Sequence, residues 1–298
     1  MAARTLILGS GGRLGSALAR EWQKSGETIT GFARRDLDLS NLETLRQTLE
    51  PLDFDVLVNC AALTNVDYCE THEAEAHRIN AEAVRVIGEV CARKGARCLH
   101  ISTDYVFDGA ARTPYSEEDP ALPISIYGAS KLAGEDALLE TSPNHLNVRV
   151  SWVFGPDRPS FVDQILQRAI EQDHAAAISD KWAVPTYTLD VAQLLYPFLR
   201  EVKEGGVLHL CNGGECTWQE YGQFALDCAV KAGVELKART VGALKMADLK
   251  AFVAKRPPYT VMSTKKLTRL TGSEPRHWQQ AVESYVMKSW APKVAASA

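Results

Sequence analysis

The chain alternates short apolar runs with longer segments in which apolar residues recur every three or four positions. The runs predict buried strands at 5–8, 28–33, 56–60, 98–101 and 146–153. The first periodic segment presents Leu14, Leu18 and Trp22 on one helix face. A longer one over 74–94 stops before Gly95. Strands that alternate with helices require a mostly parallel sheet with right-handed crossovers, so the expected fold is α/β with a doubly wound parallel sheet.

The regular alternation declines after about Gly155, and a smaller lobe is expected there. The remaining pattern predicts helices at 161–171 and 191–203 and one more strand at 207–211. The predicted domains are 1–155 for the sheet, with 184–211 returning to it, and 156–183 with 212–298 for a mixed C-terminal lobe. The Ala-rich tail from about Ala291 has little to bury and is expected to be mobile.

A glycine-rich turn follows the first predicted strand and opens the first predicted helix. Gly9, Gly12 and Gly15 have the spacing Gly-x-x-Gly-x-x-Gly, with Gly11 in addition. The start of a helix directs unpaired N–H groups and a partial positive charge at the turn, and glycine lets a pyrophosphate approach the backbone. The motif predicts a dinucleotide site in a Rossmann-type domain, and an ordinary tight turn is the alternative.

Charged residues follow the second predicted strand, where the adenosine ribose of a dinucleotide lies in such folds. Arg34 and Arg35 come first, and Asp38 and Leu39 follow. An acidic residue at this strand end favours NAD, whereas arginine accommodates a 2′-phosphate. The two arginines therefore favour NADPH, and a solvated charge pair is the alternative.

Tyr127 and Lys131 are four positions apart on a predicted helix, so their side chains share one face. A phenol with a pKa of about 10 is a poor acid or base at neutral pH, but a neighbouring cation stabilises the phenolate and lowers that pKa. The pair predicts a usable proton donor. Ser102, Thr103 and Asp104 end another predicted strand and are expected to face the same crevice as the glycine turn.

Composition and charge narrow the class of protein. The 298 residues carry a formal charge of −4, which gives no general attraction to nucleic acid or to an anionic membrane. No stretch approaches the roughly 20 apolar residues of a membrane span, and the first apolar run is too short for a signal peptide, so a cytoplasmic protein is expected. The seven cysteines lack Cys-x-x-Cys spacing and the histidines lack ligand spacing, so we expect reduced thiols and no metal site.

Several motifs occur in a fixed order along the chain. They are the glycine turn at 9–15, Asn-Cys-Ala-Ala-Leu-Thr-Asn-Val-Asp at 59–67, Ser-Thr-Asp-Tyr-Val-Phe-Asp-Gly at 102–109, Tyr-Gly-Ala-Ser-Lys-Leu-Ala-Gly-Glu at 127–135, and Ser-Trp-Val-Phe-Gly at 151–155. Together they resemble the extended short-chain dehydrogenase/reductases and, within them, the dTDP-4-dehydrorhamnose reductase family. The resemblance spans nearly the whole chain and is strongest before Gly155.

This resemblance implies an enzyme that reduces the 4-keto group of a nucleotide-linked 6-deoxy sugar with NADPH, and it leaves NADH open. The first candidate reaction converts dTDP-4-dehydro-L-rhamnose to dTDP-L-rhamnose. Tyr127 would protonate the C4 oxygen, and Thr103 would hydrogen-bond the same oxygen. Lys131 would lower the pKa of the phenol and hold the nicotinamide ribose.

Further contacts are implied at matching positions. The C-terminal lobe would bind the substrate, together with Asp104, Trp152 and Arg256. For Trp152 the alternative is a core aromatic, and for Arg256 it is a surface arginine. The implied cofactor contacts are Gly9, Ser10, Gly11, Gly12, Arg13, Leu14, Gly15, Arg34, Arg35, Asp38, Leu39, Ala61, Ala62, Leu63, Tyr127 and Lys131.

The same comparison marks departures and competing functions. Tyr105 stands where nucleotide-sugar 4,6-dehydratases carry a glutamate that serves water elimination, so simple reduction is favoured. Asp163 and the Asp-Lys-Trp-Ala at 180–183, which replaces the family's Asp-Gln-x-Gly, leave the nucleotide and the sugar open. Other hypotheses are a non-catalytic NADP-binding regulatory subunit that resembles the methionine adenosyltransferase beta subunit, and a nucleotide-sugar epimerase. Relatives often pair, which leaves a homodimer open.

Overall fold

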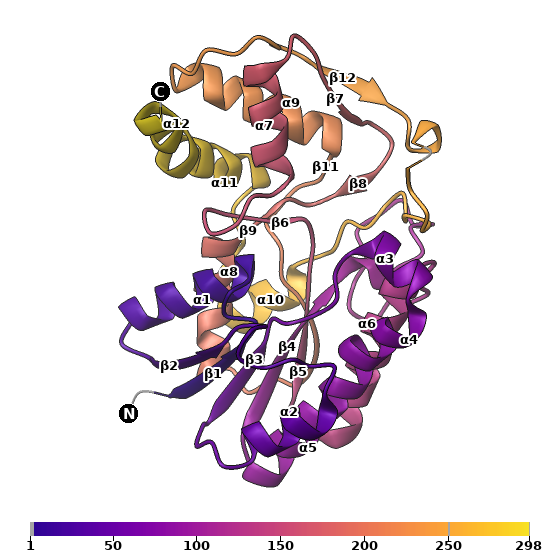
Figure 1. The fold of residues 1–298 in the computed structure, drawn as a ribbon, viewed down its shortest axis with the longest axis vertical. Helices are drawn as coiled ribbons and strands as arrows, with labels where there is room; N and C mark the ends of the chain where they lie inside the picture. The colour runs from indigo at the N-terminus through magenta and orange to yellow at the C-terminus, as the bar shows by residue number, and fades with distance from the viewer. Residues whose placement is uncertain (1–2, 250, 298) are drawn as a thin grey trace.

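The computed structural model describes residues 3–249 and 251–297, and within them a six-stranded parallel sheet forms the framework (Figure 1). Its strands, in spatial order, are β2 (Thr28–Phe32), β1 (Arg4–Leu8), β3 (Val56–Asn59), β4 (Arg97–Thr103), β5 (Leu146–Val150) and β10 (Gly206–His209). The strand order reverses between β1 and β3. Ligands of open parallel sheets bind beyond the carboxyl ends of the strands at such a reversal.

Helices cover both faces of this sheet, which explains why its central strands are buried on both sides. On one face lie α1 (Arg13–Lys24) and α8 (Thr188–Leu195), and on the other lie α2 (Leu42–Leu49), α5 (Ala83–Lys94) and α6 (Ile126–Thr141) (Figure 1). Strands β3 and β5 are buried along their whole length, whereas the edge strand β2 is largely exposed. The Trp22 indole joins α1 to α8 by donating to the Ala192 carbonyl at 2.8 Å.

The long helix expected over 74–94 is one continuous helical segment that contains a wider turn. It consists of α4 (Glu73–His77), a π-helical turn η1 (Arg78–Glu82) and α5, and it ends at Gly95, whose φ is +65°. A short helix α3 (Val66–Thr71) precedes it, and a 3-10 turn η2 (Asp104–Val106) follows β4. These elements surround the carboxyl ends of β3 and β4.

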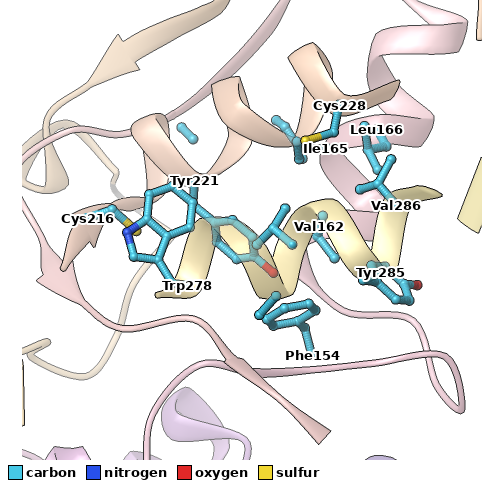
Figure 2. Close-up of a cluster of buried hydrophobic side chains, with 14 of the residues drawn as sticks. Phe154, Val162, Ile165, Leu166, Cys216, Tyr221, Cys228, Trp278, Tyr285 and Val286 are labelled. Carbon is cyan, nitrogen blue, oxygen red and sulfur yellow. The ribbon is translucent and has the colours of Figure 1, made fainter. Parts of the chain in front are cut away.

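Most of the remaining elements surround a second hydrophobic core, which is rich in aromatic side chains. Three two-stranded ladders join β6 (Val153–Phe154) to β9 (Thr186–Tyr187), β7 (Ala175–Ile178) to β12 (Val241–Leu244), and β8 (Trp182–Ala183) to β11 (Cys216–Thr217). The helical elements of this part are α7 (Phe161–Glu171), α9 (Trp218–Lys231), η4 (Met246–Asp248), α11 (Trp278–Tyr285), η5 (Val286–Trp290) and α12 (Ala291–Ser297). The helical turns η3 (Tyr196–Leu199) and α10 (Lys265–Thr271) pack into the core of the large sheet instead. Figure 2 shows Tyr221, Trp278 and Tyr285 packed together with Phe154 between α7, α9 and α11.

Three expectations for the second half require correction. The strand expected at 146–153 ends at Val150, because the chain turns at Trp152 with a φ of +36° and Val153 pairs with β9 instead. The helix expected at 191–203 is displaced toward the N-terminus as α8 and η3.

The tail expected to be mobile is the helix α12 instead. Its first residue, Ala291, is buried, and Val294 packs against the aromatic core. A tail with two apolar residues on one helix face can therefore dock. Among the helices that the structure describes, none combines the length and apolarity that a membrane span requires.

Candidate active site

A cavity of about 860 Å³ lies beyond the carboxyl ends of β1, β3 and β4, where the strand order reverses. Its volume is within the range of small-molecule and cofactor sites. The predicted site residues on its wall are Gly9, Gly11, Gly12, Arg13, Leu14, Arg34, Arg35, Asp38, Leu39, Ala61, Ala62, Leu63, Thr103, Asp104, Tyr127, Lys131 and Trp152. Ser10, Gly15 and Arg256 are the predicted residues that do not line it.

Glycine is required where the turn after β1 meets its neighbours. Gly9 has a φ of +79°, and a Cβ there would lie 2.8 Å from the Ala61 backbone nitrogen. A Cβ on Gly15 would overlap the Gly9 carbonyl, so only glycine at this position lets α1 pack closely against the turn. Gly12 is the N-cap of α1, which leaves the first backbone N–H groups of the helix at the cavity. The turn therefore has the backbone geometry of a phosphate cradle.

The loop after β3 is held by Asn80, which the sequence did not single out, and by Asn59, the first residue of the 59–67 motif. Asn80, in the π-helical turn, accepts a hydrogen bond from Leu63 N at 2.8 Å and donates to Leu63 O at 3.0 Å. Asn59 accepts from Ala61 N at 3.1 Å, and its amide lies 3.0 Å from His100 Nδ1. A π-helical turn is often associated with a functional site, but no periodicity signal in the sequence locates it.

Lys131 and Tyr127 are both buried on the wall, from the first two turns of α6. The Lys131 ammonium donates to Ile101 O at 2.8 Å and lies 3.0 Å from His100 Nε2. Burial lowers the pKa of Lys131 to about 8. Burial, with the charge of Lys131 in addition, also holds the pKa of His100 well below its ordinary value, so this imidazole is neutral. The missed residue His100 thus positions the lysine.

The phenol of Tyr127 differs from expectation in its electrostatics. Burial raises its pKa, Thr103 acts in the opposite direction through a side-chain hydrogen bond, and Asp104 raises the pKa further. Lys131 is directed toward His100 and Ile101, so the expected lowering of the phenol pKa by this lysine is not seen. The phenol is therefore protonated at neutral pH and able to donate.

Asp104 lies on the same wall and is part of a dense hydrogen-bond network. Its carboxylate accepts from Thr260 at 2.6 Å, from Ser151 at 2.9 Å and from Thr103 at 3.1 Å. Burial raises the pKa of Asp104, and the positive charge of Lys181 acts against this effect. Three hydroxyl donors and one cation thus compensate the buried carboxylate.

Lys181 was noticed in the sequence only as a departure from the family pattern. It is completely buried, donates to Pro257 O at 2.7 Å, and its ammonium lies 4.8 Å from the centre of the Tyr105 ring. Burial lowers its pKa to about 8. Lys181 therefore supplies a buried positive charge directly behind the wall of the cavity.

Trp152 and Arg256, both expected to meet the substrate, differ in position. Trp152 lines the cavity and also a neighbouring one of about 120 Å³, and its ring packs against Trp218 at 5.5 Å. Arg256 does not line the cavity, and its guanidinium donates two hydrogen bonds of 2.8 and 2.7 Å to Asp67. A carboxylate of the 59–67 motif thus occupies the donors that a diphosphate would have used.

Comparison with known proteins identifies the family. The family model described as "RmlD substrate binding domain" matches residues 3–290. This chain belongs to that family. The match confirms the family resemblance that the motifs predicted.

Relatives of this family match along almost their entire length. The spore coat polysaccharide biosynthesis protein SpsK of Bacillus subtilis (strain 168) is 32% identical over 285 residues, 96% of this chain and 97% of the relative. A dTDP-4-dehydrorhamnose reductase of Aggregatibacter actinomycetemcomitans is 32% identical over 288 residues, 95% of this chain and 98% of the relative. The crystal structure of dTDP-4-dehydrorhamnose reductase from Bacillus anthracis str. Ames, in complex with NADP, is 29% identical with a TM-score of 0.90, covering 97% of this chain and 100% of that one.

Proposed function

We propose that the chain is an NADPH-dependent oxidoreductase that reduces the 4-keto group of a nucleotide-linked 6-deoxy sugar. The observation that carries this function is a single cavity that joins the glycine turn at Gly9 to the hydroxyl groups of Thr103 and Tyr127. Relatives named as dTDP-4-dehydrorhamnose reductases support dTDP-4-dehydro-L-rhamnose as the first candidate substrate. NADH is the second candidate cofactor.

The residues present fit the cofactor and the reaction. NADPH, when bound, supplies a hydride to the ketone carbon. Tyr127 is buried and protonated, so its phenol would give the ketone oxygen the proton that completes reduction to an alcohol. Thr103 would hydrogen-bond the same oxygen, and Lys131, held by His100, would place its positive charge beside the site. Asp104 and Trp152 would orient the sugar.

The decisive experiment incubates the purified chain with NADPH and dTDP-4-dehydro-L-rhamnose, and follows the loss of NADPH absorbance. We expect stoichiometric oxidation of NADPH and formation of dTDP-L-rhamnose. A panel of other 4-keto nucleotide sugars determines the substrate range. An epimerase would show turnover without net NADPH consumption. No activity across the panel, together with a tightly co-purifying partner, would favour the regulatory subunit.

A further inference from the structure

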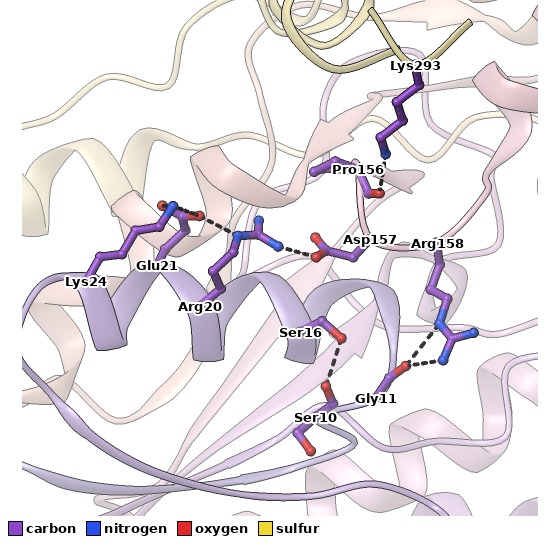
Figure 3. A network of polar contacts seen from close by, with 10 residues as sticks. All are labelled: Ser10, Gly11, Ser16, Arg20, Glu21, Lys24, Pro156, Asp157, Arg158 and Lys293. Atoms are coloured by element: carbon purple, nitrogen blue, oxygen red, sulfur yellow. Dashed lines mark hydrogen bonds and ion pairs between the residues drawn. The ribbon is translucent and has the colours of Figure 1, made fainter. Parts of the chain in front are cut away.

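Two arginines tie the glycine turn to the loop that follows β6. Arg13, the first residue of α1, donates to the carbonyl oxygens of Arg158 at 3.2 Å and Val153 at 3.3 Å. In return, Arg158 donates from Nε and Nη2 to the Gly11 carbonyl at 3.1 and 3.0 Å (Figure 3). The loop and the turn therefore hold each other through reciprocal contacts.

The loop is anchored on both sides of Arg158, and on the far side the Pro159 carbonyl accepts a hydrogen bond from Arg13. Asp157 forms an ion pair with Arg20 of α1, and the Pro156 carbonyl accepts a hydrogen bond from Lys293 of α12 at 3.0 Å (Figure 3). The anchors come from the first helix and from the last one. Because the flanking residues are held in place, the Arg158 guanidinium has a defined position beside the turn.

Arg158 belongs to the cavity wall even though it is exposed. Nε and Nη2 contact Gly11 O, and no described residue accepts a hydrogen bond from Nη1. The cationic residues on the wall are Arg13, Arg34, Arg35, Lys131 and Arg158, against the two acidic residues Asp38 and Asp104. An excess of cations around a helix N-terminus suits a ligand that carries phosphate groups, and guanidinium is the side chain best matched to phosphate oxygens.

We propose that Arg158 is a further cofactor-binding residue and contacts the diphosphate of the nicotinamide dinucleotide. The contact with Gly11 places its guanidinium at the turn where a dinucleotide diphosphate is bound by backbone N–H groups. This inference rests on the cofactor of the proposed function and adds a charged contact that no sequence motif indicated. A contact with the 2′-phosphate instead is an outcome that the experiment below distinguishes.

The test measures the dissociation constants of NADPH and NADH for Arg158→Gln and Arg158→Lys without any sugar substrate. We expect Arg158→Gln to raise the dissociation constants of both dinucleotides by a similar factor of about 10 to 100, because one charge-assisted hydrogen bond is lost. Arg158→Lys keeps the positive charge but not the planar guanidinium with its paired N–H donors, so it should lose less affinity. Arg168→Gln, an exposed arginine on α7 away from the cavity, serves as the matched control and should bind as the wild type does.

Three results would overturn the inference. Unchanged affinity in Arg158→Gln, with or without a lower melting temperature, would show that Arg158 only connects the loop to the glycine turn and does not contact the cofactor. A loss confined to NADPH would assign it to the 2′-phosphate. Failure of the wild type to bind either dinucleotide would exclude a nicotinamide dinucleotide as the ligand of this site. A wild type that binds dinucleotides but reduces no 4-keto sugar would refute the proposed function alone, because the affinities are measured without the sugar.

Discussion

At the residue scale, burial sets the proton chemistry of the site. It raises the pKa of Tyr127 and lowers the pKa of Lys131 to about 8, so both groups carry protons at neutral pH. The sequence predicted the pair from its spacing, and both side chains reach the cavity. It did not predict that Lys131 is directed toward His100, because that contact joins residues 31 positions apart on different elements.

Tyr127→Phe should bind NADPH as the wild type does yet lower kcat by a factor on the order of 100 or more, because only the donated proton is lost. Steady-state rates and an NADPH titration measure the two effects. Tyr68→Phe, an exposed tyrosine outside the cavity wall, is the control and should keep full activity. Unchanged turnover of Tyr127→Phe would exclude this phenol as the proton donor.

Lys181→Gln removes the cation that opposes the raised pKa of Asp104. Losing an opposite charge favours the protonated carboxyl, so the pKa of Asp104 should rise. We expect the acidic limb of the kcat/KM profile to move to higher pH, as measured with the sugar substrate. Lys265→Gln, an exposed lysine at the start of α10, should leave the profile in place. A profile identical to that of the wild type would show that Lys181 does not influence the pKa of Asp104.

At the element scale, the first half of the fold follows from its pattern, and in the second half α7 and β10 lie where the pattern predicts them, whereas several segments around them do not. Strand β3 is buried on both faces and apolar from Val56 to Val58, so its pattern is unambiguous. The end of β5 depends on the positive φ of Trp152, which side-chain pattern does not encode. The salt bridge of Arg256 links it to Asp67, 189 positions away, so nothing near Arg256 in the sequence reveals it.

The π-helical turn η1 gives an element-scale prediction through Asn80. Asn80→Ala removes the acceptor of the half-buried Leu63 amide and one of the two donors to the Leu63 carbonyl, so the free energy of unfolding should fall by about 1–3 kcal/mol. Since Leu63 lies on the cavity wall, the dissociation constant of NADPH should rise as well. Denaturant unfolding and an NADPH titration measure the two effects.

Asn41→Ala removes the side-chain N-cap of α2 at a position that does not itself line the cavity, and it is the matched control. It should cost about 1 kcal/mol while leaving NADPH affinity unchanged. Equal effects of both substitutions on NADPH affinity would show that η1 has no particular influence on the site.

At the scale of the whole molecule, the cavity connects the large sheet to the elements around the aromatic core. Trp152 contributes to both, because its backbone ends the β5 segment and its ring packs against Trp218. The domain boundaries predicted near 155, 183 and 211 stay a prediction, as does the homodimer. The family itself was predictable, because its motifs lie in the most regular part of the chain.

Bound NADPH should raise the melting temperature of the wild type, since a ligand at 100 times its dissociation constant stabilises the native state by about 2.7 kcal/mol. Gly9→Ala should abolish this shift, because the added Cβ would collide with the backbone of Ala61 in the loop after β3. Gly233→Ala has the same kind of strained φ, +81°, but meets nothing within 4 Å. It should lower the melting temperature slightly and keep the NADPH shift; an undiminished shift in Gly9→Ala would contradict the role of the turn.

The docking of α12 has a practical consequence for handling the protein. Lys293 reaches the loop beside the glycine turn, whereas β1 begins at Arg4, on the amino edge of the sheet and away from the cavity. A truncation that removes α12 would therefore also remove one of the contacts that hold this loop in place. Shortened versions of the chain for crystallisation should keep this helix.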